Sequence, residues 1–286
     1  LRSSSKIRPR SVSKLMQTSA TTPYSAVYLA PHLDDVTLSC GGQVFDRIEA
    51  GERILVVTVM AGSPVLSAES EYIASLHDRW QLAGDAAAER RAEDAAACAI
   101  LGADYLHLDV PDCIYRLSPA DGTPLYNSDF DIFGEIHAAE AGLQAHIAEL
   151  FRTLPAAAKI VAPLTVGHHV DHLLVRAAAE QVWADGLWYY EDYPYVENRG
   201  FLRRVLGDDL RAWRPAIFDV SENGLQAKFD AIWAFRSQLS TFFGSRAEME
   251  ARVRGYCETA GGERLWEKFP ASLNPNAHDL HDSHDS

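Results

Sequence analysis

The stretch SAVYLAPHLDD, residues 25–35, joins an apolar run to a polar turn. Its first six residues are small, apolar or aromatic, which favours a buried strand. The run leads directly into Pro31, after which His32, Asp34 and Asp35 follow within four positions. In an open α/β sheet, ligands bind at the carboxyl ends of the strands, where the chain continues into a helix. This stretch therefore predicts an α/β fold whose first strand ends in a functional site.

Short apolar runs alternate with longer helical patterns through the rest of the chain. This alternation predicts a Rossmann-like α/β fold with a mostly parallel sheet flanked by helices. Further strands are expected at residues 53–61, 104–109, 159–164, 187–191 and 215–220. Helices are expected near residues 39–51, 85–101, 134–154, 170–185 and 222–237. Residues 110–133 contain Pro-flanked polar stretches and are expected to form a long loop of the kind that shapes binding sites.

The chain contains no internal repeat and no linker that would divide it. Residues 1–23 are basic and rich in Ser and Thr, which is typical of a disordered leader. Residues 271–286 alternate His with Asp and are expected to form a flexible tail. Residues 24–270 are therefore expected to form one α/β domain.

The charge balance excludes some partners. The chain has 26 Lys and Arg against 40 Asp and Glu, and five of the bases lie in residues 1–23, which contain no acid. The remaining 21 bases against 40 acids give residues 24–286 a formal charge of −19. Such a body repels phosphate backbones and anionic membrane surfaces, so we expect neither nucleic acid nor a membrane as a partner. A homo-oligomer is compatible with this composition.

No apolar run approaches the roughly 20 residues that a bilayer requires. The basic N-terminal stretch also lacks the apolar core of a secretory signal. We therefore expect a cytoplasmic protein.

A second polar cluster follows the expected strand at 159–164. It contains His168, His169, Asp171 and His172 at the head of an Ala-rich helical stretch. Packing alone hardly explains three His and one Asp within five residues. Because parallel strands end at one edge of a sheet, this cluster and the first can share a pocket, where they supply the donors of a catalytic zinc site with one open position. The plainer reading of the first cluster is a helix start capped by an Asp.

The two clusters resemble the motifs of the LmbE-like or PIG-L de-N-acetylases, zinc hydrolases that remove acetyl groups from N-acetylglucosamine-type amino sugars. The first family motif is His-Pro-Asp-Asp, which stands here as His32-Leu33-Asp34-Asp35. The second is His-x-Asp-His, which stands here as His169-Val170-Asp171-His172. The resemblance implies one Zn²⁺ per chain, with another divalent metal as the alternative. The implied metal ligands are His32, Asp35 and His172.

The resemblance also implies roles for other residues of the site. Asp34 would be the general base, while His169 would assist as a charged imidazole at the oxyanion with Asp171 orienting its ring. The family's Arg-x-x-Glu motif matches residues 90–93, which implies that Arg90 faces the substrate. The Asp at the end of the family's next strand matches Asp112, with the same implication.

We therefore expect a hydrolase that removes an N-acetyl or other N-acyl group from a small amino-sugar conjugate. Leu33 replaces the family's usual Pro, and residues 62–85 and 200–286 match no family pattern, which leaves the substrate open. One alternative is an amidase that uses the same metal core on a larger thiol conjugate or glycoconjugate. Another is a non-catalytic sugar- or metal-binding protein. A nucleotide-binding enzyme is disfavoured, because Gly41-Gly42 is not the G-x-G-x-x-G fingerprint.

Overall fold

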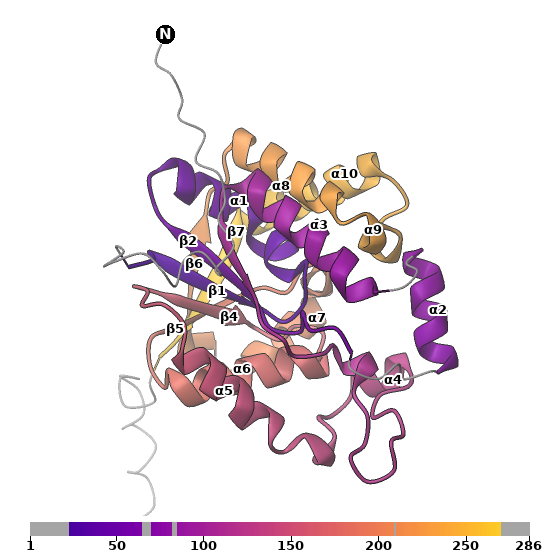
Figure 1. Cartoon of the computed structure of the whole chain (residues 1–286). Helices are drawn as coiled ribbons and strands as arrows, with labels where there is room; N and C mark the ends of the chain where they lie inside the picture. Colours follow the sequence, from indigo (N-terminus) through magenta and orange to yellow (C-terminus); the bar gives the residue numbers. More distant parts are fainter. Residues whose placement is uncertain (1–22, 65–69, 82–84, 209, 270–286) are drawn as a thin grey trace, which may run out of the picture.

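The computed structural model describes residues 23–64, 70–81, 85–208 and 210–269 (Figure 1). The leader expected at 1–23, apart from Pro23, and the tail expected at 271–286 lie outside these residues. Within the described part of the chain, no helix is both long and apolar enough to cross a membrane.

A seven-stranded sheet forms the centre of the fold, in the order β3-β2-β1-β4-β5-β7-β6. Its strands are β1 (Ala26–Ala30), β2 (Ile54–Thr58), β3 (Asp104–His107), β4 (Ile160–Pro163), β5 (Leu187–Tyr190), β6 (Trp213–Phe218) and β7 (Glu263–Lys268). Neighbouring strands among β1 to β5 pair in parallel, whereas β7 is antiparallel to both β5 and β6. The expected mostly parallel α/β sheet is confirmed. Strand β7 was not predicted, because its sequence ERLWEK is rich in charged residues.

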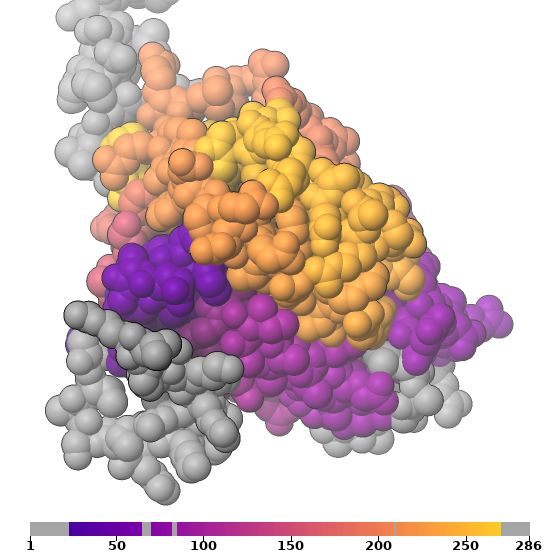
Figure 2. All heavy atoms as spheres, turned by 90° about the horizontal axis from the view of Figure 1, so that it is seen from above, coloured from indigo at the N-terminus to yellow at the C-terminus, as the bar shows by residue number. Residues whose placement is uncertain are grey.

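Helices cover both faces of the sheet (Figure 1). One face carries α1 (Asp35–Glu49), α3 (Ala86–Leu101) and α8 (Glu222–Ala234), which pack on one another. The other face carries the packed pair α5 (Leu143–Arg152) and α6 (Val170–Val182). Figure 2 shows the orange segment of α8 beside the purple and magenta segments that belong to α1 and α3. Segments far apart in sequence therefore build one helical layer.

Five further helices were not predicted from the sequence. They are α2 (Glu71–Trp80), α4 (Asp129–Ile132), α7 (Arg199–Leu206), α9 (Arg236–Phe242) and α10 (Arg246–Ala260). Two of the predicted helices begin several residues away from the expected start. Helix α1 begins at Asp35 rather than near residue 39, because Asp34 occupies the N-cap position. The helix expected at 134–154 covers only α5, since Gly142 stands at its N-cap.

Alternate side chains of β1 enter two different cores, as the period-two geometry of a strand requires. Val27 and Leu29 pack in the core beneath α5 and α6, with Phe151. Ala26 and Tyr28 pack in the core beneath α1, α3 and α8. Strand β1 is therefore buried on both sides, which explains its nearly unbroken apolar sequence.

The strand order reverses direction between β1 and β4. Strands β2 and β3 continue to one side of β1, while β4 pairs with its other side. Such a switch point opens a crevice at the carboxyl ends of the two strands, where α/β proteins bind ligands. The two polar clusters follow β1 and β4, so the topology brings both to this crevice.

Candidate active site

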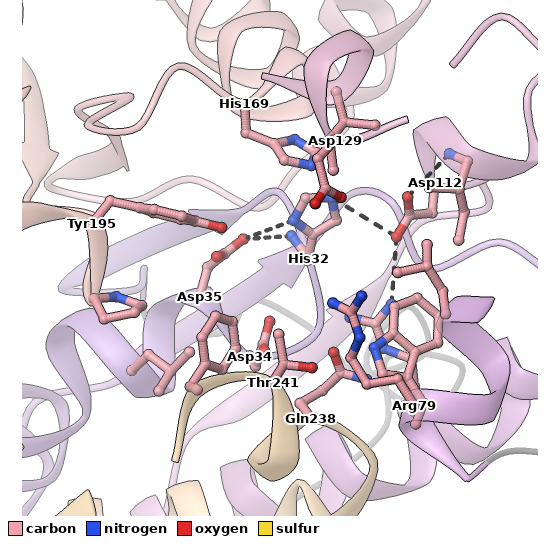
Figure 3. Close-up of a pocket in the computed structure, with 18 of the residues that line it drawn as sticks. His32, Asp34, Asp35, Arg79, Asp112, Asp129, His169, Tyr195, Gln238 and Thr241 are labelled. Atoms are coloured by element: carbon pink, nitrogen blue, oxygen red, sulfur yellow. Dashed lines mark hydrogen bonds and ion pairs between the residues drawn. The ribbon is translucent and has the colours of Figure 1, made fainter. Parts of the chain in front are cut away.

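The two predicted clusters meet at the carboxyl ends of β1 and β4 (Figure 3). His32 lies between β1 and α1, and Asp35 is the first residue of α1. His169 is the N-cap of α6, and His172 lies in the first turn of that helix. The ring centroid of His32 lies 4.8 Å from that of His169 and 5.3 Å from that of His172. The side chains that the sequence analysis placed in one pocket are thus adjacent.

Carboxylates fix the rings of two of these histidines. The Nε2 atom of His32 lies 3.0 Å from the Oδ2 atom of Asp171. The Nδ1 atom of His172 lies 2.6 Å from the Oδ1 atom of Asp192. Metal-binding histidines almost always have their second ring nitrogen held by such a group, which sets the tautomer and the ring orientation.

The other nitrogen of each ring faces Asp35. The Oδ2 atom of Asp35 lies 3.5 Å from Nδ1 of His32 and 3.4 Å from Nε2 of His172. Two imidazole nitrogens and one carboxylate oxygen form a donor set that zinc accepts in catalytic sites. The residues present therefore fit a metal at the position that the sequence predicts.

Other donor sets overlap this one. Ligand atoms of His32, His169 and His172 lie within 4.8 Å of one another. Two further groups of three candidate donors include Asp171. That carboxylate already pairs with the guanidinium of Arg116, whose Nη1 atom lies 2.6 Å from Oδ1, so it is less available to a cation. Among the residues that the structure describes, all three candidate donor sets lie in the same crevice.

Asp34 lies beside the donors but faces elsewhere. It occupies the N-cap position of α1, yet its side chain makes no capping hydrogen bond. Its side chain lines the pocket although only 6% of the residue is exposed. Burial, followed by the neighbouring Asp35 carboxylate, raises the pKa of Asp34 to about 6. A carboxylate of raised pKa is a stronger proton acceptor than an ordinary one.

His169 is held through its Nδ1 atom, which accepts a hydrogen bond of 3.2 Å from the backbone N–H of Asp171. A neutral imidazole with an accepting Nδ1 carries its proton on Nε2, so the ring is a donor toward the pocket. Burial, followed by the charge of His32, also lowers the pKa of His169 well below its ordinary value. A charged ring was expected from the resemblance, whereas this geometry favours a neutral one.

The Asp171 carboxylate contacts residues other than the one expected. It was expected to orient the His169 ring, but its Oδ2 atom lies against His32 and accepts a 3.0 Å bond from the backbone N–H of Cys113. Its Oδ1 atom pairs with Arg116. Arg116 in turn pairs with Glu140, so a buried chain of charges leads from the loop 110–140 to His32. In this geometry Asp171 therefore orients His32.

Arg90 and Asp112, both expected to face substrate, lie together at the pocket wall. The Nη1 atom of Arg90 lies 3.4 Å from Oδ2 of Asp112, and both residues are buried. The Arg90 guanidinium also lies over the Trp80 ring, 5.0 Å from its centroid. The pair forms a polar wall beside His32, whose Nε2 atom is 3.9 Å from Asp112.

Segments outside the two polar clusters complete the pocket, which has a volume of about 280 Å³. One of them lies in residues 110–133, which were expected to shape a binding site. Helix α2 contributes Arg79 and Tyr72, α4 contributes Asp129, and α9 contributes Gln238. The Tyr72 hydroxyl donates a 2.7 Å hydrogen bond to Asp129. Tyr195, in the short 3₁₀-helix η4 (Tyr195–Glu197), enters from the side opposite Asp112 (Figure 3).

Sequence reasoning missed Asp192 and Arg116. Asp192 follows β5 as His32 follows β1, so the same positional signal could have identified it. Arg116 carries no such signal, because only the folded loop brings it to Asp171. His168, which the sequence analysis left unassigned, is exposed, and its Nε2 atom lies 3.4 Å from Glu135.

Known proteins share this architecture and these motifs. The family model described as PIG-L, GlcNAc-PI de-N-acetylase, matches residues 27–183, which contain both clusters together with Arg90 and Asp112. The chain is 27% identical over 259 residues to 2'-N-acetylparomamine deacetylase of Niallia circulans, an alignment that covers 84% of this chain and 89% of the relative.

Two further deacetylases are similar to this chain. The chain is 30% identical over 177 residues to 2'-N-acetylparomamine deacetylase of Streptomyces fradiae, which covers 60% of this chain and 57% of the relative. The crystal structure of the zinc-inhibited form of teicoplanin deacetylase Orf2 superposes with a TM-score of 0.71 at 25% identity, covering 84% of this chain and 96% of that one.

Proposed function

Because this chain belongs to the PIG-L family of de-N-acetylases, we propose that its crevice holds one zinc ion and hydrolyses an acetamide of an amino sugar. The protein is a metal-dependent de-N-acetylase of amino-sugar conjugates.

We assign the zinc to His32, Asp35 and His172. One observation carries this assignment: each imidazole is fixed through one nitrogen by a carboxylate, and the other nitrogen faces the same oxygen of Asp35. When bound, zinc polarises a carbonyl oxygen and lowers the pKa of water toward about 7. The buried surroundings strengthen such charge interactions, because little water screens them.

Asp34 acts as the general base of the proposed reaction. Water adds to the acyl carbon, Asp34 takes the proton that the water loses, and the carbonyl electron pair moves to the oxygen. The C–N bond then breaks, and Asp34 returns the proton to the departing nitrogen, which leaves the amine and acetic acid. The acid then releases its remaining proton to the amine or to water and becomes acetate. The side chain suits both steps because it is buried, free of capping contacts and of raised pKa.

His169 stabilises the oxyanion as a neutral donor. Its Nδ1 atom accepts the backbone N–H of Asp171, so Nε2 carries the proton that can be donated to the acyl oxygen. In this role His169 keeps its proton and only donates a hydrogen bond to the oxygen. Burying a neutral ring beside a cation also costs less free energy than burying a charged ring there.

The substrate is a conjugate whose amino sugar alone enters the pocket. The pocket volume of about 280 Å³ lies just below the usual range of about 300–1,000 Å³ for small-molecule pockets, which suits one sugar ring. Arg90 and Asp112 offer a donor and an acceptor for its hydroxyl groups. The relatives are named for 2'-N-acetylparomamine and teicoplanin, so we propose a glycosylated antibiotic or its precursor as the substrate class.

The test combines zinc analysis with acetate release from a panel of N-acetylated amino-sugar conjugates. His32→Ala should lose both zinc and turnover. Asp34→Asn should keep zinc but lose turnover by about 10² to 10⁴, the usual contribution of a general base. Undiminished turnover in both variants would overturn the assignment. Binding of the conjugates without acetate release by the wild type would instead indicate a sugar-binding protein.

A further inference from the structure

Tyr195 lines the catalytic pocket, but the reaction described above does not use it. The residue opens η4, two positions before Glu197, on the segment that follows β5. Figure 3 shows its ring lying along one wall with the hydroxyl pointing toward Asp35, on the side opposite Asp112. The phenol therefore faces the donor group that we assign to the metal, beside which the acyl group of a substrate would lie.

The Tyr195 hydroxyl has no partner among the residues that the structure describes. Other tyrosine hydroxyls bond to protein groups, such as those of Tyr72 to Asp129, Tyr126 to Glu140 and Tyr193 to Glu197. Tyr105 is the other tyrosine for which the described residues show no such bond, and it lies on β3 outside the pocket. A half-buried hydroxyl aimed into a catalytic pocket without a partner is a donor available to a ligand.

The ring is held in place from several sides. It meets the Phe133 ring edge to face at 5.7 Å and the His172 ring at 6.4 Å. The backbone of Gly167 lies so close that an added Cβ there would stand 2.7 Å from Cγ of Tyr195. Because packing already fixes this hydrogen-bond donor, little free energy is spent on reorienting it when negative charge develops nearby.

The segment that carries Tyr195 is also anchored at its base. Asp192 accepts a 2.8 Å bond from the Val166 N–H and contacts His172 through its other oxygen. The N–H of Tyr193 donates to Oγ of Ser39 in α1, 3.1 Å away. The segment that carries Tyr195 is thus held in part by Asp192, which also contacts the proposed metal ligand His172.

We propose that Tyr195 is a catalytic residue that donates a hydrogen bond to the acyl oxygen as the tetrahedral state forms. The inference rests on the proposed function and adds a second donor opposite the Asp112 wall. The C=O electron pair moves to the oxygen when water adds, and the Tyr195 O–H and the His169 N–H both bond to that oxygen without losing their protons. The bonds weaken again when the carbonyl re-forms and the C–N bond breaks. A phenol is suited to this role because its pKa near 10 keeps it protonated at neutral pH.

The test compares Tyr195→Phe with Tyr105→Phe, the variant that removes the other unpartnered hydroxyl. Loss of one oxyanion donor lowers kcat by about 10² to 10³. We expect this loss in Tyr195→Phe, with KM, zinc content and melting temperature unchanged, and no change in Tyr105→Phe. A second probe is an amino sugar whose acetyl is replaced by a tetrahedral methylphosphonyl group. It should bind about 100-fold more weakly to Tyr195→Phe than to the wild type.

Three results would overturn the inference. A kcat within twofold of the wild type would show that the hydroxyl does not act in the reaction. A raised KM with unchanged kcat would make it a ground-state contact, and a loss of zinc would make it part of the metal site. If the wild type itself releases no acetate, the proposed function fails. If the wild type and Tyr195→Phe release it equally, only the role of Tyr195 fails.

Discussion

The Nδ1 atom of His172 lies 2.6 Å from the Oδ1 atom of Asp192, 20 residues farther along the chain. Both side chains are almost completely buried. The contact joins the helix after β4 to the segment after β5, so two neighbouring strand ends hold one imidazole. It leaves Nε2 of His172 directed at Asp35.

This contact predicts that Asp192 sets the affinity of the site for zinc. In Asp192→Asn the carboxylate no longer raises the basicity of the His172 ring, and zinc affinity should fall 10- to 100-fold. Competition with a chelator measures the change. Asp185→Asn, at an exposed position, is the control and should bind zinc as the wild type does. Equal affinity in Asp192→Asn would contradict the role given to this carboxylate.

Arg116 should be a major contributor to stability. Arg116→Met would leave the buried carboxylates of Asp171 and Glu140 without their cation, and breaking such a pair costs about 3–5 kcal/mol. Urea unfolding of the metal-free protein measures the loss separately from zinc binding. Arg254→Met removes an exposed partner of Glu222 and should leave the free energy of unfolding unchanged. Similar effects of the two substitutions would refute the prediction.

Gly167 should be required for the position of Tyr195. Its φ of +105° is a conformation that side chains rarely adopt, and an added Cβ would overlap the Tyr195 ring. Gly167→Ala should therefore lower kcat at least as much as Tyr195→Phe. Gly186→Ala has comparable backbone strain at φ +80° but open space around its Cβ, so its activity should be unchanged. Equal activities of the two alanine variants would argue against the packing constraint.

The four free cysteines should not react in the native protein. Cys40, Cys98, Cys113 and Cys257 are buried, and burial raises the pKa of each thiol. Since the thiolate is the reactive form, iodoacetamide at pH 8 should label none of them until denaturant is added. Mass spectrometry counts the labels. Rapid labelling of the folded protein would mean that a thiol is exposed or that its pKa is lowered.

The central parallel strands β1, β2 and β4 could be predicted because they are short apolar runs, as expected of strands buried on both faces. Strand β7 could not be predicted, since the sequence ERLWEK is typical of an exposed segment. In the structure it pairs with β5 and β6 and is therefore the second strand from the edge of the sheet. A local sequence shows the spacing of apolar residues that is typical of a strand, but it does not show which other strands will pair with it.

In the site, too, some features could be predicted from the sequence and others could not. His32 and His172 could be predicted as neighbours, because strand ends meet at a switch point. The partner of Asp171 could not, since the choice between the His169 and His32 rings depends on side-chain geometry within a few ångströms. Arg79 and Gln238 reach the pocket from α2 and α9, which contact each other only after folding.

Acetate release before and after removal of zinc tests the central claim most directly. The substrate is 2'-N-acetylparomamine or another N-acetylated amino-sugar conjugate, and the protein is used as purified, stripped by a chelator, and reloaded. We predict that the stripped protein releases no acetate and that one equivalent of zinc per chain restores release. Undiminished release by the metal-free protein, or none by the reloaded protein on any conjugate, would contradict the account.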